Sequence, residues 1–113
     1  PRGGRGVFAM ALQLVSFRAT LNDPSFGEVH EGMVKGMRDL AESIDGFVEW
    51  RDAMDGLEYW GFVVFASDEA AQAWKGHPTH AAIHQQGEES VYSGFSTQVF
   101  EQVRGAEWRR DDA

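Results

Sequence analysis

Hydrophobic and polar residues alternate along four stretches of the chain, and apolar residues recur every three or four positions in two others. The alternation, with its period of two, predicts strands over residues 10–20, 47–54, 57–65 and 91–103. An apolar stripe with helical spacing predicts an amphipathic helix, and it is formed by Phe26, Val29, Met33, Met37, Leu40 and Ile44. A second helical stretch covers about residues 67–87, so the predicted order is β-α-β-β-α-β.

The ends of these elements carry start and stop signals. Asn22, Asp23 and Pro24 open the first helix, because Asp23 can accept from free amides and Pro24 suits the first helical position. A glycine at position 46 ends that helix. Asp55 and Gly56 predict a two-residue hairpin turn between the second and third strands.

The β-α-β-β-α-β order is the split βαβ arrangement of ferredoxin-like domains, an α+β fold with a four-stranded antiparallel sheet and both helices on one face. The third strand is apolar on both faces, since Trp60 and Phe62 alternate with Tyr59 and Val63. Helices on one side of a single sheet would leave one of these faces in water. We therefore expect a homodimer that pairs two sheets as a dimeric α+β barrel, with a pocket in each subunit between sheet and helices.

Composition limits the classes of function. The 113 residues suffice for one domain, which we place at residues 10–104, between a disordered leader over residues 1–9 and a charged C-terminal tail over residues 105–113. A net charge of −8 with scattered basic residues argues against nucleic acid as a partner. The absence of cysteine excludes disulfides and thiolate zinc sites. No apolar run reaches the roughly 20 residues of a membrane helix and no secretory signal opens the chain, so we expect a soluble, cytoplasmic protein.

Three of the four histidines lie in the eleven residues from Trp74 to His84. Pro78 restricts the residue before it, so a helix that carries Trp74 should stop near Gly76 and a second should start at Pro78. On that second piece His80 and His84 share a face, which suits an acid–base pair, a metal or one axial haem ligand. The alternative interpretation is that the bend only packs Trp74 into the core, while the histidines cap helix ends and meet water.

The chain resembles the antibiotic biosynthesis monooxygenase-like family of the dimeric α+β barrel superfamily over about residues 12–104. The residues that carry the resemblance are Phe17 and Arg18, Asp45 to Phe47, Trp60 to Phe65, Trp74 to His80, Gly87 and Tyr92. The resemblance implies the fold and dimer described above. It also implies an oxidoreductase that oxidises an aromatic or polyketide-like molecule with O2, without metal or flavin. In such a monooxygenase the substrate itself reduces oxygen, while the protein supplies a base, a dry aromatic pocket and a donor for the developing oxyanion.

In an enzyme of this type His84 or His80 would be the base, and we expect His84 and Trp74 to be the catalytic residues. Many relatives have Gln at the position of His84, which distinguishes this histidine from the others. The expected substrate-binding residues are His80, Phe17, Arg18, Trp50 and Trp60. Arg18 would stabilise negative charge, or would otherwise be a solvated charge at the end of a strand.

Three alternatives remain open. The haem-degrading monooxygenases of the same superfamily have a haem-ligating His ten residues after a Trp, as His84 follows Trp74 here. They also use an Asn on the first strand where this chain has Phe17, which argues against haem degradation and leaves haem binding through His84. A non-catalytic dimer that binds a small apolar ligand is the second alternative. The third is a metal held by His80 and His84 with His77 or Glu88, for which no recognised motif is present.

Overall fold

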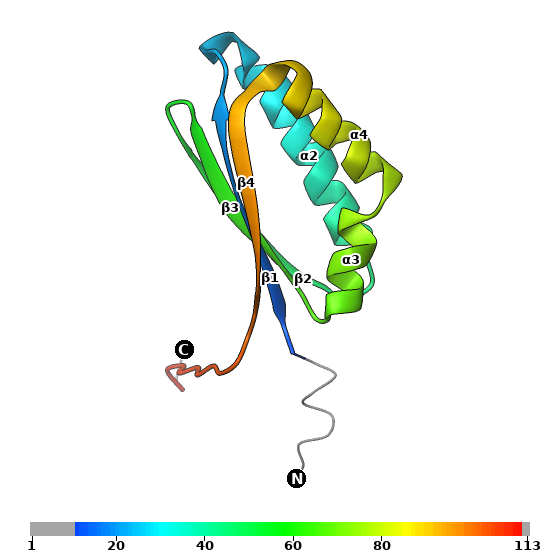
Figure 1. Ribbon diagram of the computed structural model, residues 1–113. Coiled ribbons are helices and arrows are strands. Elements are labelled where there is room, and N and C mark those ends of the chain that lie inside the picture. Colours follow the sequence, from blue (N-terminus) through cyan, green and yellow to red (C-terminus); the bar gives the residue numbers. More distant parts are fainter. Residues whose placement is uncertain (1–10, 112–113) are drawn as a thin grey trace.

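A computed structural model describes residues 11–111, so the expected leader at residues 1–9 lies outside the described residues. The domain has two layers, a four-stranded sheet and a set of helices on one of its faces (Figure 1). Along the chain the elements are β1 (Gln13–Leu21), η1 (Pro24–Phe26), α2 (Gly27–Ser43), β2 (Phe47–Asp55), β3 (Glu58–Phe65), α3 (Asp68–Lys75), α4 (Pro78–Gln86), η2 (Gly87–Val91) and β4 (Tyr92–Glu101). The strands are antiparallel in the order β2-β3-β1-β4, which confirms the predicted ferredoxin-like α+β fold. No helix within residues 11–111 is long and apolar enough to cross a lipid bilayer.

The strand register places the odd-numbered residues of β1 beneath the helices. Val15 pairs with Val63, and Phe17 pairs with Gly61 on one side and Thr97 on the other. Because directly opposed residues of an antiparallel pair share a face, these side chains all point toward the helices. The core lies in this layer, where Val15, Val63 and Phe65 are at most 1 % exposed.

The hairpin turn lies one residue later than the sequence predicted. Strand β2 continues to Asp55, which pairs with Glu58, so the two loop residues are Gly56 and Leu57. Gly56 has a φ of 62°, which glycine adopts without steric cost. Glycine at the first of the two loop positions is typical of a type II′ turn, so the turn chemistry was recognised but its register was not.

The predicted break between the two later helices is confirmed. Helix α3 ends at Lys75 and α4 begins at Pro78. His77 between them is extended, and its Nδ1 accepts a hydrogen bond from the Thr79 amide at 3.0 Å. His77 is therefore the N-cap of α4, in agreement with the alternative interpretation for this one histidine.

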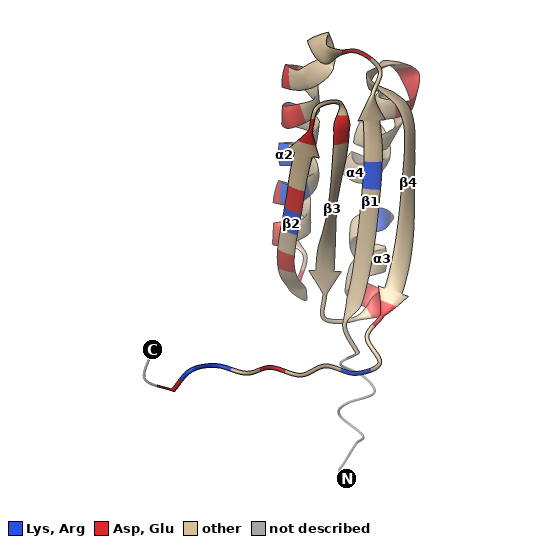
Figure 2. Ribbon diagram, turned by 90° about the vertical axis from the view of Figure 1, so that its left-hand side faces the viewer, with Lys and Arg blue, Asp and Glu red and all other residues tan. Residues whose placement is uncertain are grey.

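No helix of residues 11–111 covers the other face of the sheet (Figure 2). We call it the open face, and its apolar residues are Leu14, Trp60, Phe62, Val64 and Phe100. Trp60 is 45 % exposed and Phe100 is 53 % exposed. After β4, residues 102–111 leave the sheet as an extended arm on the side away from the helices (Figure 1).

Candidate functional site

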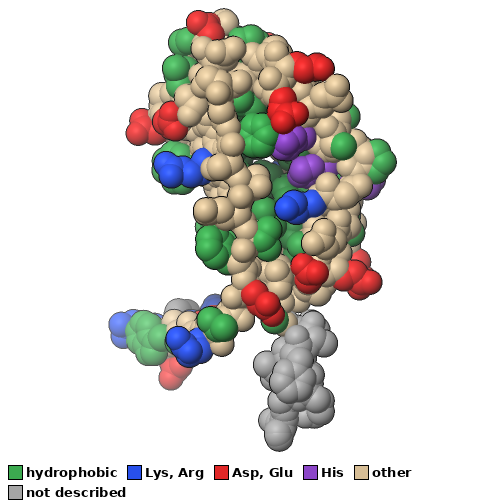
Figure 3. Space-filling model, viewed as in Figure 1, with side chains coloured by type: hydrophobic (Ala, Val, Ile, Leu, Met, Phe, Trp, Pro, Cys, Tyr) green, Lys and Arg blue, Asp and Glu red, His purple; other side chains and the backbone are tan. Residues whose placement is uncertain are grey.

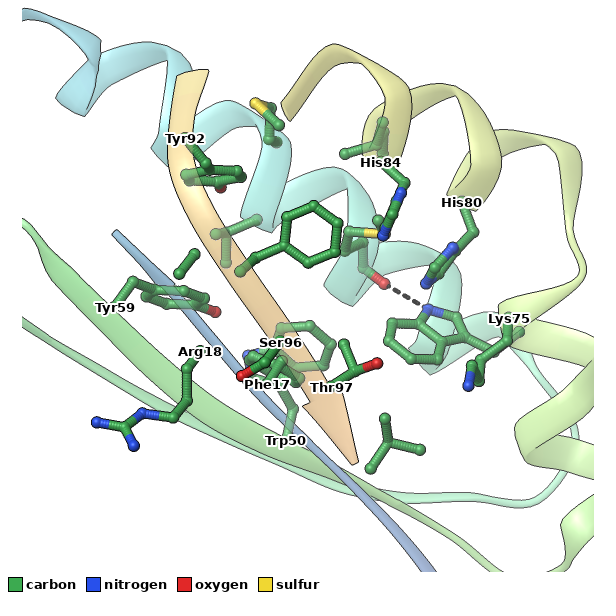
Figure 4. A pocket seen from close by; sticks show the side chains of 18 residues that line it. Phe17, Arg18, Trp50, Tyr59, Lys75, His80, His84, Tyr92, Ser96 and Thr97 are labelled. Atoms are coloured by element: carbon green, nitrogen blue, oxygen red, sulfur yellow. Dashed lines mark hydrogen bonds between the residues drawn. The ribbon is translucent and has the colours of Figure 1, made fainter. Parts of the chain in front are cut away.

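A cavity of about 130 Å³ lies between the sheet and the helices (Figure 4). Its position matches the pocket expected from the order of the elements. Aromatic side chains make up much of its wall, and they are Phe17, Trp50, Tyr59, Trp74, Tyr92 and Phe95. Figure 3 shows histidine side chains beside a cationic side chain in the hollow between β4 and the helices.

Two tryptophans form the deep wall of this cavity. The Trp74 indole Nε1 donates to the backbone carbonyl of Met37 on α2 at 3.0 Å, which fixes α3 against α2. The Trp50 ring meets the Trp74 ring edge to face at 6.1 Å and packs against Phe17 at 5.0 Å. Trp74 is 4 % exposed and Trp50 is 7 % exposed, so the expected cavity residues Phe17, Trp50 and Trp74 come together in one aromatic wall.

His80 lies against this wall from the helix side. Its ring contacts Trp74 edge to face at 4.6 Å and stacks on His84 at 6.1 Å (Figure 4). Burial, followed by the charges of His84 and Lys75, lowers the pKa of His80 to about 4. His80 is therefore a neutral imidazole at neutral pH, suited to hydrogen bonding and weak as a base.

His84 occupies the outer part of the same helix face. Its ring packs edge to face on Phe95 of β4 at 4.4 Å, and its Nδ1 lies 4.0 Å from the Glu88 carboxylate. The side chain is 38 % exposed, so it reaches both the cavity and solvent. A histidine with a carboxylate behind it and a route to water is the better placed of the two as a proton acceptor.

The structure corrects two of the expected site residues. Trp60 belongs to the open face and does not line the cavity. Arg18 forms part of the cavity wall along β1, but its guanidinium points away from the cavity (Figure 4). Both corrections follow from strand geometry. Successive side chains of a strand point to opposite faces, so Arg18 points away from the face that Phe17 occupies. Trp60 is paired with Arg18 across β1 and β3 and therefore lies on the same face as Arg18.

A buried pair of polar side chains, for which the sequence predicts no role, lies at the opposite end of the cavity. His30 of α2 is 4 % exposed, and its Nδ1 lies 2.7 Å from the hydroxyl oxygen of Tyr92, which lines the cavity. Burial lowers the pKa of His30 and raises the pKa of Tyr92 to about 12, so both groups are neutral. His30 precedes Met33 and Met37 by three and seven residues, a helical spacing that could have placed it on the buried face.

Neither a metal site nor a haem site fits these residues. Within residues 11–111 no group of three His, Asp or Glu side chains is arranged to hold a metal ion, and His77 caps a helix instead of joining His80 and His84. An engineered cavity of about 150 Å³ holds one benzene molecule. A haem, with four pyrrole rings, does not fit the cavity of about 130 Å³ as it stands.

The pKa of His80 predicts how stability responds to acid. Its value in the folded state is about 4, below the ordinary 6.5, so between these two pH values the unfolded chain binds a proton that the folded chain does not. We expect the urea midpoint to be constant above about pH 7 and to fall as the pH drops toward 4. A His80→Asn variant should lose part of this dependence while His30 retains its own share, and an unchanged slope in that variant would contradict the assignment.

No protein-family model matches the chain, and no curated protein sequence matches it significantly. Solved structures do match. Rv0793 from Mycobacterium tuberculosis has 17 % sequence identity and a TM-score of 0.73, with 85 % of this chain and 99 % of that chain covered. SnoaB, a cofactor-independent oxygenase from Streptomyces nogalater, has 12 % identity and a TM-score of 0.71, with 85 % and 96 % covered. A dabb family protein with a ferredoxin-like fold from Mesorhizobium loti has 13 % identity and a TM-score of 0.65, with 83 % and 99 % covered. These similarities establish a shared fold.

Proposed function

We propose that the protein is a small oxygenase that oxidises an aromatic molecule with O2, without metal or flavin. The observation that carries this proposal is the position of His84, which borders a dry aromatic cavity and has the Glu88 carboxylate 4.0 Å from its Nδ1. A base at the edge of an apolar cavity can deprotonate the substrate, and the resulting anion is electron-rich enough to reduce O2. The shared fold with a cofactor-independent oxygenase adds support.

The chemistry can be written for 1-naphthol as a model substrate. His84 takes the hydroxyl proton, and the resulting naphtholate passes an electron to O2. The two radicals then combine, forming a carbon–oxygen bond at the ring position opposite the hydroxyl. The peroxide takes a proton from His84 and loses water together with the ring hydrogen, so that naphthol and O2 give 1,4-naphthoquinone and water. Trp50 and Trp74 exclude bulk water from this sequence, and neutral His80 supplies a hydrogen bond.

We also propose that the working unit is a homodimer formed through the open face. The support is the apolar character of that face, where no helix in the described part of the chain covers Trp60, Phe62 and Phe100. A second copy related by a two-fold axis would cover the same residues on both sheets at once. The arm of residues 102–111 leaves on the same side, with Val103 85 % exposed and Trp108 75 % exposed.

The test is O2 uptake with 1-naphthol, with formation of 1,4-naphthoquinone as the second readout. We expect the His84→Ala variant to lose about 10²- to 10⁴-fold in turnover, the usual contribution of a positioned base. Gln85→Ala, an exposed neighbour on α4, is the matched control and should keep the parent rate. Parent activity in His84→Ala would contradict the role of His84, and binding of 1-naphthol without O2 uptake in the parent would favour a non-catalytic container.

A haem titration of the same proteins distinguishes the remaining alternative. Because the cavity is too small for the macrocycle, we expect no saturable change in the visible spectrum of added haem. Saturation at one haem per subunit that disappears in His84→Ala would replace the oxygenase proposal by haem binding through His84.

A further inference from the structure

The charged residues that line the cavity are all basic. The chain has 18 Asp and Glu residues against 10 Lys and Arg residues. Among the described residues, none of those lining the cavity is acidic, and the permanently charged ones are Arg18 and Lys75. Since the Arg18 guanidinium points away from the cavity, Lys75 is left as the fixed positive charge at this site (Figure 4).

Lys75 stands where the cavity meets α3 and α4. It is the last residue of α3, follows Trp74 directly and is half-buried. Its positive charge contributes to the lowered pKa of His80, and both residues line the same cavity. Within residues 11–111 Lys75 forms no ion pair, whereas Lys35 on α2 pairs with Asp39 at 2.7 Å. Glu88 faces His84 Nδ1 at 4.0 Å and is not part of the cavity lining.

We infer that the cavity binds an aromatic carboxylate of one or two rings, with the carboxylate at Lys75 and the rings against Trp50 and Trp74. The volume of about 130 Å³ sets the size, because it is close to that of a cavity that holds one benzene ring, and a second ring can lie toward the mouth. The charge follows from Lys75: a half-buried ammonium that forms no ion pair within residues 11–111 favours an anion, whereas the chain as a whole, with a net charge of −8, repels anions. Lys75 thereby takes the charge-stabilising role that the sequence suggested for Arg18. The inference rests on the proposed function only in using the same cavity.

The experiment compares 2-naphthoate with 2-naphthamide by isothermal titration calorimetry. The two probes have the same rings and nearly the same shape and differ in charge. We expect the parent protein to bind 2-naphthoate about fivefold more tightly, a preference that shrinks as salt is raised. Lys75→Met keeps the aliphatic stem and should remove the preference by weakening 2-naphthoate alone. Lys35→Met, which removes a lysine remote from the cavity, should leave the preference intact.

Three results would overturn the inference: equal affinity for the two probes in the parent, a preference that survives in Lys75→Met, or no binding of either probe. Circular dichroism of Lys75→Met establishes that the variant is folded. If Lys75 instead binds a phenolate, 1-naphthol should bind more weakly to Lys75→Met than to the parent. The parent should then bind 2-naphthoate and 2-naphthamide equally well, which overturns the inference of a carboxylate ligand. The binding experiment does not require either probe to be oxidised. A failed oxygenase assay therefore does not contradict the preference for 2-naphthoate. Conversely, oxidation of 1-naphthol does not establish that preference, and the binding experiment can still refute it.

Discussion

Replacing Phe62 by lysine is expected to convert the proposed homodimer into a monomer at micromolar protein concentration, with a dissociation constant raised at least a thousandfold. Phe62 lies on the central strand β3 of the open face, and the residues directly opposite it are Ser16 and Arg51. An ammonium placed there faces no carboxylate directly across the sheet, and a two-fold interface buries it twice. An uncompensated buried charge costs about 3–5 kcal/mol, and each 1.4 kcal/mol is about tenfold in affinity.

Sedimentation velocity over a range of concentrations is the measurement. The matched control is Val29→Lys, because Val29 is 43 % exposed on α2, on the helical side of the domain. That variant should sediment as the parent does. A parent protein that is monomeric at every concentration, or a Phe62→Lys variant that stays dimeric, would refute the proposed interface.

Replacing Trp74 by alanine is expected to lower the free energy of unfolding by about 3–5 kcal/mol, a large part of the 5–15 kcal/mol typical of a domain. The substitution removes the 4 % exposed indole that contacts Trp50, Phe65 and His80. It also removes the indole N–H that donates to the Met37 carbonyl of α2. The cavity would merge with the space left by the indole, so the site should lose its shape together with its stability.

Urea unfolding at one fixed protein concentration measures this loss, since the stability of a dimer depends on concentration. Gln72→Ala is the control, an exposed position two residues earlier on the same helix, and it should change the free energy by less than about 0.5 kcal/mol. A Trp74→Ala variant as stable as this control would mean that the indole is not a structural centre of the domain.

The sequence predicted those features that depend on neighbouring residues. The break at Pro78 was predictable because proline restricts the residue before it, and the histidine cap of α4 is equally local. The errors at Arg18 and Trp60 were avoidable. The alternation that predicts a strand over residues 10–20 already puts Phe17 and Arg18 on opposite faces, and the third strand likewise has Trp60 and Tyr59 on opposite faces. Arg18 and Trp60 were predicted to line the pocket because of their residue types, although the two-residue period of the strands already assigned both side chains to the other face of the sheet.

Other parts of the site depend on contacts that no local pattern contains. The bond between His30 and Tyr92 joins residues 62 positions apart, and only the packing of α2 on β4 brings them together. The position of Lys75 also depends on long-range packing. Its place in the cavity depends on how α3 lies over the sheet, which the Trp74 hydrogen bond to α2 determines. Long-range docking of helices therefore decides which polar groups reach an otherwise apolar interior.

The four tryptophans fall in three separate regions of the molecule. Trp50 and Trp74 line the cavity, Trp60 stands on the open face, and Trp108 is 75 % exposed on the C-terminal arm. Indole emission depends on the polarity around each ring, so the intrinsic fluorescence of this protein is a composite of a buried pair, a sheet-surface residue and a solvated residue. Single substitutions to phenylalanine would resolve that composite into separate optical signals for occupancy of the cavity, covering of the sheet and the environment of the arm, without any added dye.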